Sequence, residues 1–333
     1  MSKVLCSVAT RGRYHTTLPL VLNAIINQSK PVDKLVIFDD NDEPQDMRKE
    51  MIYSYFFQML DLKAIKWEWR YAGKKGQHHI HQQANDMAVN DGFDWVWRCD
   101  DDAIPEPDVL KVLHSYAIGI NETDDSKVGA VGGAVLTPPN LFEHVNSTGK
   151  IDQIDSEPNI QWSPINRVRQ VEHLHCTFLY RAGVHNYNTG LSRVAHREET
   201  LFTYGLFQKG YKVLAVPGAI TWHMKNPQGG IRSETNAELY AQDERIFRNY
   251  LAVRDKTVVV LNCGMGDHIV FSHILPKLKD PVVFTCYPDI IPGKSIADAR
   301  LLFGDIDNWS VYKWMAHRKW TGSLEDAFRG MYL

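Results

Sequence analysis

Short apolar runs and amphipathic segments alternate along the first part of this 333-residue chain. Apolar or β-branched runs predict strands, and apolar residues at helical spacing predict the helices between them. The predicted strands cover 4–8, 35–38, 65–71 and 94–98, and the predicted helices cover 18–26, 47–60 and 77–89. This alternation is typical of an α/β fold, in which helices cover a mainly parallel sheet.

The alternation continues less regularly to about residue 225. We expect helices over 106–118 and 197–209, and strands over 128–136, 173–180 and 213–216. Residues 137–169 are rich in Pro, Asn and Ser, which predicts a long surface excursion. Residues 225–230 predict a loop, and 233–250 predict another helix.

A separate pattern begins after residue 254. Residues 257–261 and 282–285 predict strands, with a tight turn at 264–267 and a helix over 269–278 between them. This order predicts one Rossmann-like βαβ unit. We therefore expect two domains, 1–254 and 255–333.

Polar residues follow the predicted strands. Because ligands of open parallel sheets bind beyond the carboxyl ends of the strands, we expect these residues to converge on one crevice. They are Thr10, Arg11 and Arg13 after the first strand, Asp39 and Asp40 after the second, and Asp100, Asp101 and Asp102 after the fourth.

The acidic triplet at 100–102 directly follows a buried-type strand. Like charges in a row repel each other unless a cation or solvent relieves them. On extended backbone, Asp100 and Asp102 leave the same face and can meet one divalent cation. The alternative is an acidic turn in which one carboxylate caps the helix that begins near Pro105.

Composition narrows the class of protein only slightly. Hydrophobic residues make up 44% and charged residues 23% of the chain, and the net charge of −3 provides no overall attraction to nucleic acid or an anionic membrane. The five cysteines form no CxxC pair, so they suggest neither a zinc knuckle nor a disulfide framework. We find no signal-peptide pattern and no membrane-spanning stretch, and expect a cytoplasmic protein.

Residues 3–225 resemble the family 2 glycosyltransferases of GT-A fold. The resemblance rests on four blocks in order, 8–13, 38–41, 76–85 and 98–110, of which the last is a DXD-type motif. It implies a mixed, mainly parallel sheet flanked by helices. It also implies a metal-dependent, inverting hexosyltransferase that uses a nucleotide-diphospho-sugar, with a UDP-sugar favoured.

The resemblance also implies roles for the residues at the strand ends. Asp100 would face the ribose or base, and Asp102 would bind Mn²⁺ or Mg²⁺ with Asp100 nearby, while Asp101 turns away. Asp39 or Asp40 would accept hydrogen bonds from the nucleobase. The remaining residues expected at the nucleotide are Thr10, Arg11, Arg13 and, in a loop that orders over the donor, Arg232. For Arg11 and Arg13 the alternative is a surface cation beside a turn.

The second half of the resemblance concerns a base and a further metal ligand. Residues 196–200 resemble the acidic block of the family, with Glu199 in place of the family's Asp. Inverting transfer needs a base for the acceptor hydroxyl, and Glu199 or Glu198 would supply it. The alternative is a pair of acids that stabilises a helix N-terminus. His223 stands where related enzymes complete the metal shell, unless it is a structural histidine.

Two other clusters are weaker candidates. His78, His79 and His81 do not converge at their helical spacing, so we expect a polar helix face there rather than a metal site. The basic residues of 63–75 surround Trp67 and Trp69 and could bind a polyanion, but we expect the tryptophans to face the core.

Residues 264–268 resemble the N-terminal block of heptosyltransferase-like enzymes of GT-B fold, in which an Asp at the position of Asp267 is a base. GT-B chemistry needs two complete Rossmann domains, and too few residues follow 257. We therefore interpret this segment as a structural or acceptor-binding accessory.

The acceptor and the oligomeric state stay open at this point. The acceptor is a glycan or a hydroxymethylated pyrimidine in DNA, as in related phage enzymes. The rival interpretation is a non-catalytic module that binds nucleic acid or carbohydrate on a GT-A scaffold, which a fold alone does not exclude.

Overall fold

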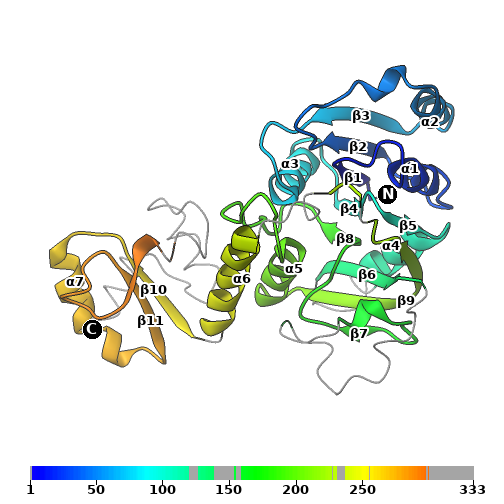
Figure 1. The fold of residues 1–333 in the computed structure, drawn as a ribbon. Coiled ribbons are helices and arrows are strands. Elements are labelled where there is room, and N and C mark those ends of the chain that lie inside the picture. Colours follow the sequence, from blue (N-terminus) through cyan, green and yellow to red (C-terminus); the bar gives the residue numbers. More distant parts are fainter. Residues whose placement is uncertain are drawn as a thin grey trace. The chain divides into compact units, whose positions relative to one another are not determined.

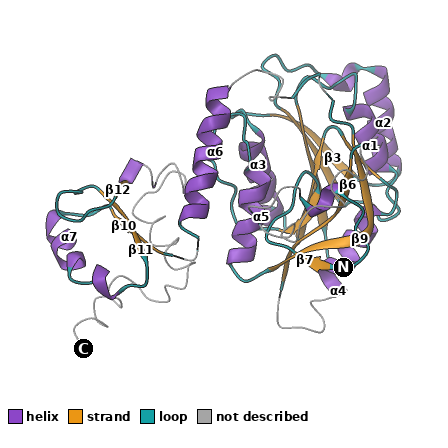
Figure 2. Cartoon of the chain, turned by 60° about the horizontal axis from the view of Figure 1, so that its bottom comes forward, coloured by secondary structure: helices purple, strands orange, loops and turns teal. Residues whose placement is uncertain are grey.

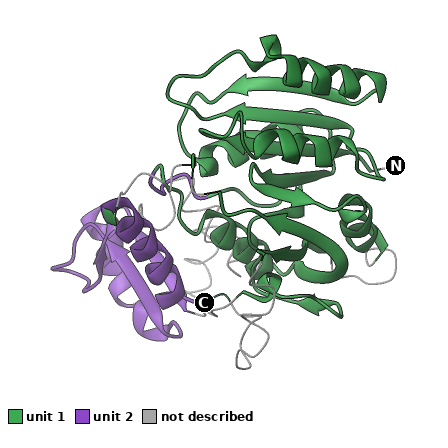
Figure 3. Ribbon diagram, turned by 45° about the vertical axis from the view of Figure 1, so that its right-hand side comes forward, with its two compact units in different colours: residues 1–187, 193–237 green, residues 188–192, 238–333 purple. Residues whose placement is uncertain are grey.

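The computed structural model describes residues 2–119, 127–138, 154, 159–226, 228–230, 237–254, 256–297 and 299. The chain divides into two compact units (Figure 3). The first comprises Met1–Tyr187 and Arg193–Ala237, and the second comprises Asn188–Ser192 and Glu238–Leu333. The domain boundary expected at 254/255 stays a prediction, because compactness alone does not define an independently folding domain. Among the described residues, no helix is both long and apolar enough to cross a membrane.

The first unit is built on a nine-stranded sheet in the order β3-β2-β1-β4-β8-β6-β9-β5, with β7 paired to β9 (Figure 1). Strands β1 to β4 are parallel, β8 is antiparallel to β4 and β6, β6 is parallel to β9, and β5 and β7 are antiparallel to β9. The strands are β1 (Val4–Thr10), β2 (Lys34–Asp39), β3 (Lys66–Tyr71), β4 (Trp95–Asp100), β5 (Ala103–Pro105), β6 (Val128–Leu136), β7 (Arg169–Gln170), β8 (Phe178–Arg181) and β9 (Lys212–His223).

Helices cover both faces of this sheet, because the side chains of each strand alternate between the faces (Figure 2). On one face, α1 (Leu18–Ile26), α2 (Met51–Leu62) and α4 (Val109–Gly119) pack on strand residues that include Val4 and Val8. On the other face, α3 (Gln77–Asn90) and α5 (Glu198–Gln208) pack on residues that include Leu5. The mixed, mainly parallel α/β architecture expected from the sequence is confirmed.

The second unit has its own small parallel sheet and its own core. The sheet has the order β10-β11-β12, with β10 (Thr257–Leu261), β11 (Pro281–Thr285) and β12 (Lys294–Ser295). Leu261, Phe271 and Ile274 belong to its apolar core. Among its described residues, the helical elements include α6 (Ala237–Ala252), α7 (Met265–Ser272) and the 3-10 turn η5 (Leu275–Lys277).

Several predicted elements have different bounds in the structure. The strand expected over 173–180 is wrong in its first half, because Cys176 has a φ of 61°, which an extended strand does not allow. The strand expected over 213–216 continues to His223 in β9. The helix expected over 47–60 is divided into the 3-10 turn η1 (Met47–Lys49) and α2.

Two further helices differ from prediction at their ends. The helix expected over 106–118 begins only at Val109, and the helix expected over 269–278 is α7 followed by η5. A third 3-10 turn, η3 (Ile160–Trp162), lies within the expected surface excursion. Most of 137–158, the start of the helix predicted from 233, and Arg232 lie outside the described residues.

Candidate active site

The carboxyl ends of β1, β2 and β4 lie next to each other in the sheet. Thr10 pairs with Asp39 across β1 and β2, and Ala9 pairs with Asp100 across β1 and β4. The polar segments that follow these strands therefore meet at one edge, as the strand order requires.

Asp101 is buried and holds the segment after β1 in place. Its carboxylate accepts hydrogen bonds from the Thr10 hydroxyl, at 2.8 Å, and from the Arg11 backbone N–H, and it pairs with Arg13. Burial raises the pKa of Asp101 to about 6, although Arg13 opposes this effect. From the sequence, Asp101 was expected to turn away. In the structure its carboxylate connects the end of β4 to the loop after β1.

Asp102 and His223 come together across two strands. Ala103 of β5 pairs with His223 of β9, and the Met224 N–H donates to the Asp102 carbonyl at 2.9 Å. The His223 Nε2 lies 3.4 Å from Asp102 Oδ1, while Arg13 Nη2 lies 3.1 Å from Asp102 Oδ2. One carboxylate oxygen and one imidazole nitrogen are therefore placed where both could contact one small cation.

Asp100 points to a different partner. Arg98 Nη2 donates to Asp100 Oδ1 at 2.9 Å, and Arg98 Nη1 donates to Glu198 Oε1 at 2.6 Å. Burial acts most strongly on the pKa of Asp100 and raises it, but the charge and hydrogen bond of Arg98 leave that pKa below its usual value. Asp100 is therefore held as a carboxylate.

Glu198 and Glu199 begin α5 but lie in different surroundings. The Glu198 side chain is fully buried against Arg98, and burial raises its pKa to about 8 against the attraction of Arg98. Glu199 Oε1 lies 2.8 Å from the Nδ1 of His175, whose side chain is one-fifth exposed. Both acids are buried, but they have different partners, Arg98 for Glu198 and the partly exposed His175 for Glu199, which their adjacency in the sequence does not reveal.

Asp39 and Asp40 direct their carboxylates into the protein. Asp39 accepts hydrogen bonds from the Tyr14 hydroxyl and from the backbone and side chain of Asn41. Asp40 accepts from the Gly76 N–H, and burial raises its pKa to about 6. Both carboxylates therefore organise the loop after β2 in this structure.

A cavity of about 380 Å³ lies beside these residues. Arg11 lines it, with its guanidinium paired to Asp42 and bonded to the Asp40 carbonyl at 2.7 Å. The other lining residues are Gly12, Asn41, Asp42, Glu43, Gly229 and Gly230. The sequence analysis included Asn41 in the 38–41 block but gave it no role, and it missed Asp42 and Glu43, although their position directly after a strand end was a usable signal.

The glycine loop at 228–230 lies directly on the loop after β1. The Gly230 N–H donates to the Arg11 carbonyl at 2.7 Å, and Arg13 donates to the carbonyls of Asn226 and Gln228. A Cβ atom on Gly229 would lie 2.7 Å from the Gly12 carbonyl oxygen. Only glycine permits this approach of the two loops.

The histidine cluster of α3 corrects one expectation. His78 and His81 are fully buried rather than on a polar helix face, because this side of α3 packs against the sheet. Burial lowers the pKa of His78 to about 3 and lowers that of His81 well below its ordinary value. Within the described part of the chain, no three His, Cys, Asp or Glu side chains are placed to hold a metal by themselves.

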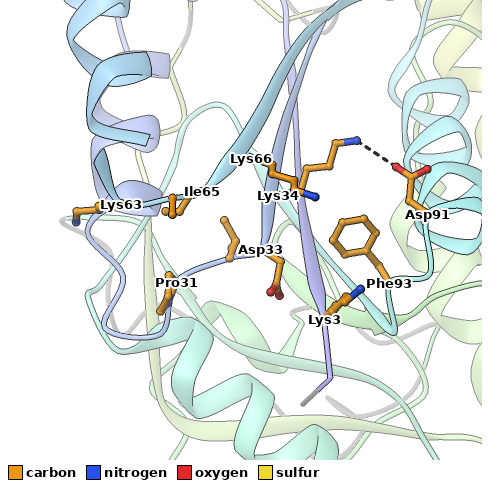
Figure 4. A pocket seen from close by; sticks show the side chains of 11 residues that line it. Lys3, Pro31, Asp33, Lys34, Lys63, Ile65, Lys66, Asp91 and Phe93 are labelled. Atoms are coloured by element: carbon orange, nitrogen blue, oxygen red, sulfur yellow. Dashed lines mark hydrogen bonds and ion pairs between the residues drawn. The ribbon is translucent and has the colours of Figure 1, made fainter. Parts of the chain in front are cut away.

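The basic and aromatic residues of 63–75 are largely paired or packed. Trp67 stacks on Phe57 with ring centres 4.1 Å apart, and both Trp67 and Trp69 pack against the core as expected. A hollow of about 570 Å³ beside Lys63 and Lys66 lies at the amino ends of β1 to β3 (Figure 4). Lys34 in this hollow is paired with Glu68 and Asp91, so the lysines do not form a purely cationic surface.

Gly264 follows β10 and lies at the start of a helix in the second unit. Gly264 caps α7, and its carbonyl lies 2.9 Å from Nδ1 of the buried His268, whose Nε2 lies 2.8 Å from the Thr285 hydroxyl. Asp267 lies in the first turn of α7. The likeness of this segment to GT-B enzymes stays a prediction.

Comparisons with known proteins identify the fold. No protein-family model and no curated protein matches the sequence. The chain is similar to S. aureus TarS 1–349 in complex with UDP-GlcNAc, with 13% identity and a TM-score of 0.52 over 82% of this chain and 71% of that chain. It covers 43% of the chain in another TarS structure.

Two further solved structures are similar at lower TM-scores. GalNAc-T7 with UDP, GalNAc and Mn²⁺ has 11% identity and a TM-score of 0.49 over 91% of this chain and 58% of that chain. The mannosyltransferase PcManGT from Pyrobaculum calidifontis, in complex with GDP-Man and Mn²⁺, has 16% identity and a TM-score of 0.46 over 95% of this chain and 73% of that chain.

The sheet order and the likeness to the TarS 1–349 fragment define the class. The chain has the mixed α/β fold of GT-A glycosyltransferases. At this level of identity the likeness concerns the fold, and the chemistry has to be argued from the site.

Proposed function

We propose that this protein is a glycosyltransferase that moves a sugar from a nucleotide-diphospho-sugar to an acceptor hydroxyl, with a divalent metal and with inversion. The observation that carries the proposal is the placement of Asp102 beside His223, with Glu199 in the first turn of α5. The charges of both Glu199 and His223 act on the pKa of Asp100, the first raising it and the second lowering it. The proposed metal ligands Asp102 and His223, on the donor side, thus share one site with the proposed base Glu199, on the acceptor side.

The donor is proposed to be a UDP-sugar, since the TarS 1–349 fragment that this fold resembles was solved with UDP-GlcNAc. We assign the nucleoside to the 380 Å³ cavity, where Arg11 and Asn41 can offer hydrogen bonds. Thr10 and Arg13 contribute indirectly, because their contacts with Asp101 hold the loop after β1 in place. Asp39, Asp40 and Arg232 remain proposed contributors to nucleotide binding.

The residues present fit Mn²⁺ or Mg²⁺. Such cations are commonly held by one or two carboxylates together with substrate phosphates. Asp102 and His223, with Asp100 nearby, can therefore supply the ligands that the protein has to contribute. When bound, the cation would neutralise diphosphate charge and favour departure of the leaving group. Arg13 beside Asp102 adds a positive charge on the same side.

Glu199 is our proposed base. It would accept the proton of the acceptor hydroxyl while the new bond forms between that oxygen and the anomeric carbon. The bond from the anomeric carbon to the phosphate oxygen breaks, and the nucleoside diphosphate leaves with the electron pair. Glu199 suits this role better than Glu198, whose carboxylate is fully buried and committed to Arg98.

The proposal extends to the acceptor, the family and the second unit. The acceptor is a glycan or a hydroxymethylated pyrimidine in DNA, both of which offer a hydroxyl. The proposed family is family 2, and the second unit is proposed to be an accessory. The rival function is a non-catalytic module that binds nucleic acid or carbohydrate. Steep salt dependence of DNA binding without any sugar transfer would favour that rival.

The test begins with UDP-, GDP- and TDP-sugars, screened for hydrolysis that requires Mn²⁺ or Mg²⁺. The active donor is then offered to glycans and to hydroxymethylated DNA. For Asp102→Ala we expect loss of Mn²⁺-dependent UDP binding and of turnover, whereas Asp108→Ala, at an exposed site on the same segment, leaves both unchanged. Full activity of Asp102→Ala would refute the metal assignment.

Glu199→Gln separates binding from chemistry. This substitution keeps the shape of the side chain and removes its basicity, so we expect donor affinity to persist while the transfer rate falls by at least about 100-fold. Full transfer by Glu199→Gln would overturn the assignment of the base.

A further inference from the structure

Arg98 joins the two halves of the candidate site. It lies on β4, is almost completely buried, and uses its two terminal nitrogens for two different carboxylates. One is Asp100 at the end of the same strand. The other is Glu198 at the start of α5, 100 positions after Arg98 in the sequence. We propose that Arg98 is a positioning residue that couples the donor-side carboxylate to the helix that presents the base, an inference that rests on the proposed function.

The geometry requires the forked shape of arginine. Nη1 reaches Glu198 Oε1 at 2.6 Å, and Nη2 reaches Asp100 Oδ1 at 2.9 Å. The guanidinium is also supported by the ring of Phe178 on β8, whose centre lies 5.3 Å from Cζ. A lysine ammonium at this position is a single point of charge and cannot reproduce both contacts in a fixed plane.

The turn before α5 needs such support. Ala195 and Arg197 have φ values of 53° and 67°, in the left-handed region that non-glycine residues seldom adopt. Strained backbone of this kind persists when surrounding contacts hold it. The bond from Arg98 to Glu198 fixes the first residue of the helix, and thereby the direction in which the next residue, Glu199, leaves the backbone.

The same guanidinium orients Asp100. Rotation of Arg98 would displace both carboxylates together, because they share one planar group. One side chain therefore contributes to the positions of both Asp100 and Glu198. We therefore expect that substitutions of Arg98 and Glu198 do not affect kcat independently.

The experiment compares Arg98→Lys, Glu198→Gln and the double variant with wild type in the full chain. Arg181→Lys is the matched control, because Arg181 also lies over an aromatic ring, that of Trp95, but its guanidinium donates to the backbone carbonyl of Val128 rather than to a carboxylate among the described residues. For each variant, kcat, UDP affinity with Mn²⁺ and Tm are measured. We expect Arg98→Lys to lower kcat by about 10- to 100-fold, as loss of a supporting contact to an active-site ligand commonly does.

Glu198→Gln should lower kcat more than UDP affinity, because this residue reaches the donor side only through Arg98. In the Arg98→Lys background, the same substitution should cost little more, since the coupling is already lost. Multiplicative effects in the double variant would overturn the coupling. Unchanged kcat in Glu198→Gln would overturn it even if Arg98→Lys does not fold.

Amide hydrogen exchange gives a readout that does not depend on turnover. We expect faster exchange across 195–200 in Arg98→Lys and not in Arg181→Lys. A wild-type protein that is inactive with every donor refutes the proposed function, and the exchange result then decides separately whether Arg98 holds the turn. Unchanged exchange together with a lowered Tm would reduce Arg98 to a general stabiliser of the fold.

Discussion

Individual charged residues at this site are distinguished by their partners rather than by their types. Asp101 binds Thr10 and Arg13, Asp102 lies between Arg13 and His223, and Asp100 pairs with Arg98. Since each carboxylate has a cation or donor close by, the repulsion within the triplet is relieved by the protein itself. The triplet is therefore compatible with a stable fold before any ligand binds.

His78 leads to a prediction about stability and pH. Its pKa is about 3 in the folded protein and 6.5 in an unfolded chain, so between these values the unfolded state binds a proton that the folded state does not. The free energy of unfolding should therefore fall as the pH falls from 6.5 towards 3, by up to about 1.4 kcal/mol per pH unit from this residue.

His78→Leu should flatten this dependence in denaturant titrations at several pH values. His79→Leu is the control, because the neighbouring imidazole is partly exposed and its substitution should change the slope less. Equal slopes in wild type and His78→Leu would contradict the prediction.

At the scale of elements, two loops from distant parts of the chain form one wall of the candidate nucleotide cavity. The loop after β1 and the glycine loop at 228–230 approach so closely that Gly12 and Gly229 face each other without side chains. The contact is reinforced by the hydrogen bond from Gly230 to Arg11. The shape of the cavity thus depends on glycine at particular positions.

Gly229→Ala should damage this wall, and Gly218→Ala provides the matched control. Both glycines have φ near +80°, so each substitution should cost about 1–2 kcal/mol in backbone strain. Only at Gly229 would the added methyl group meet backbone atoms below 3 Å, whereas at Gly218 it meets nothing within 4 Å. We expect weaker UDP binding for Gly229→Ala alone, measured by calorimetry. Equal UDP affinities of the two variants would contradict this view.

At the scale of the whole molecule, each compact unit has a separate apolar core. Leu5 belongs to a core of the first unit, with residues of α3 and α5, and Leu261 belongs to the core of the second unit. Both leucine side chains are almost completely buried. Stability and nucleotide binding can therefore be perturbed separately.

Leu261→Ala and Leu5→Ala form a matched pair for this purpose. Each should lower the free energy of unfolding of its own unit by about 2–5 kcal/mol, because a buried leucine is replaced by a cavity. In thermal unfolding with and without UDP, we expect Leu261→Ala to retain the stabilisation by UDP at its full size. Leu5→Ala should lower the UDP-responsive transition. Loss of the UDP effect in Leu261→Ala would show that the second unit takes part in binding.

The sequence by itself determined the order of most helices and strands, because hydrophobic periodicity is a local property that survives in any fold with this class of layers. It also determined that Thr10, Asp39 and the 100–102 triplet follow strand ends. Even the bounds of α1 and β6 agree with the predicted ranges. Local patterns failed where burial was decided by packing, as at His78 and His81.

Only the tertiary structure decided which charged groups meet. Arg98 and Glu198 are 100 positions apart, and Arg13 and Asn226 are 213 positions apart, yet both pairs are hydrogen-bonded. Such contacts arise from strand pairing and loop packing, and no local pattern along the chain encodes them. The division of the acidic residues into internal anchors, candidate metal ligand and candidate base is therefore a property of the folded molecule.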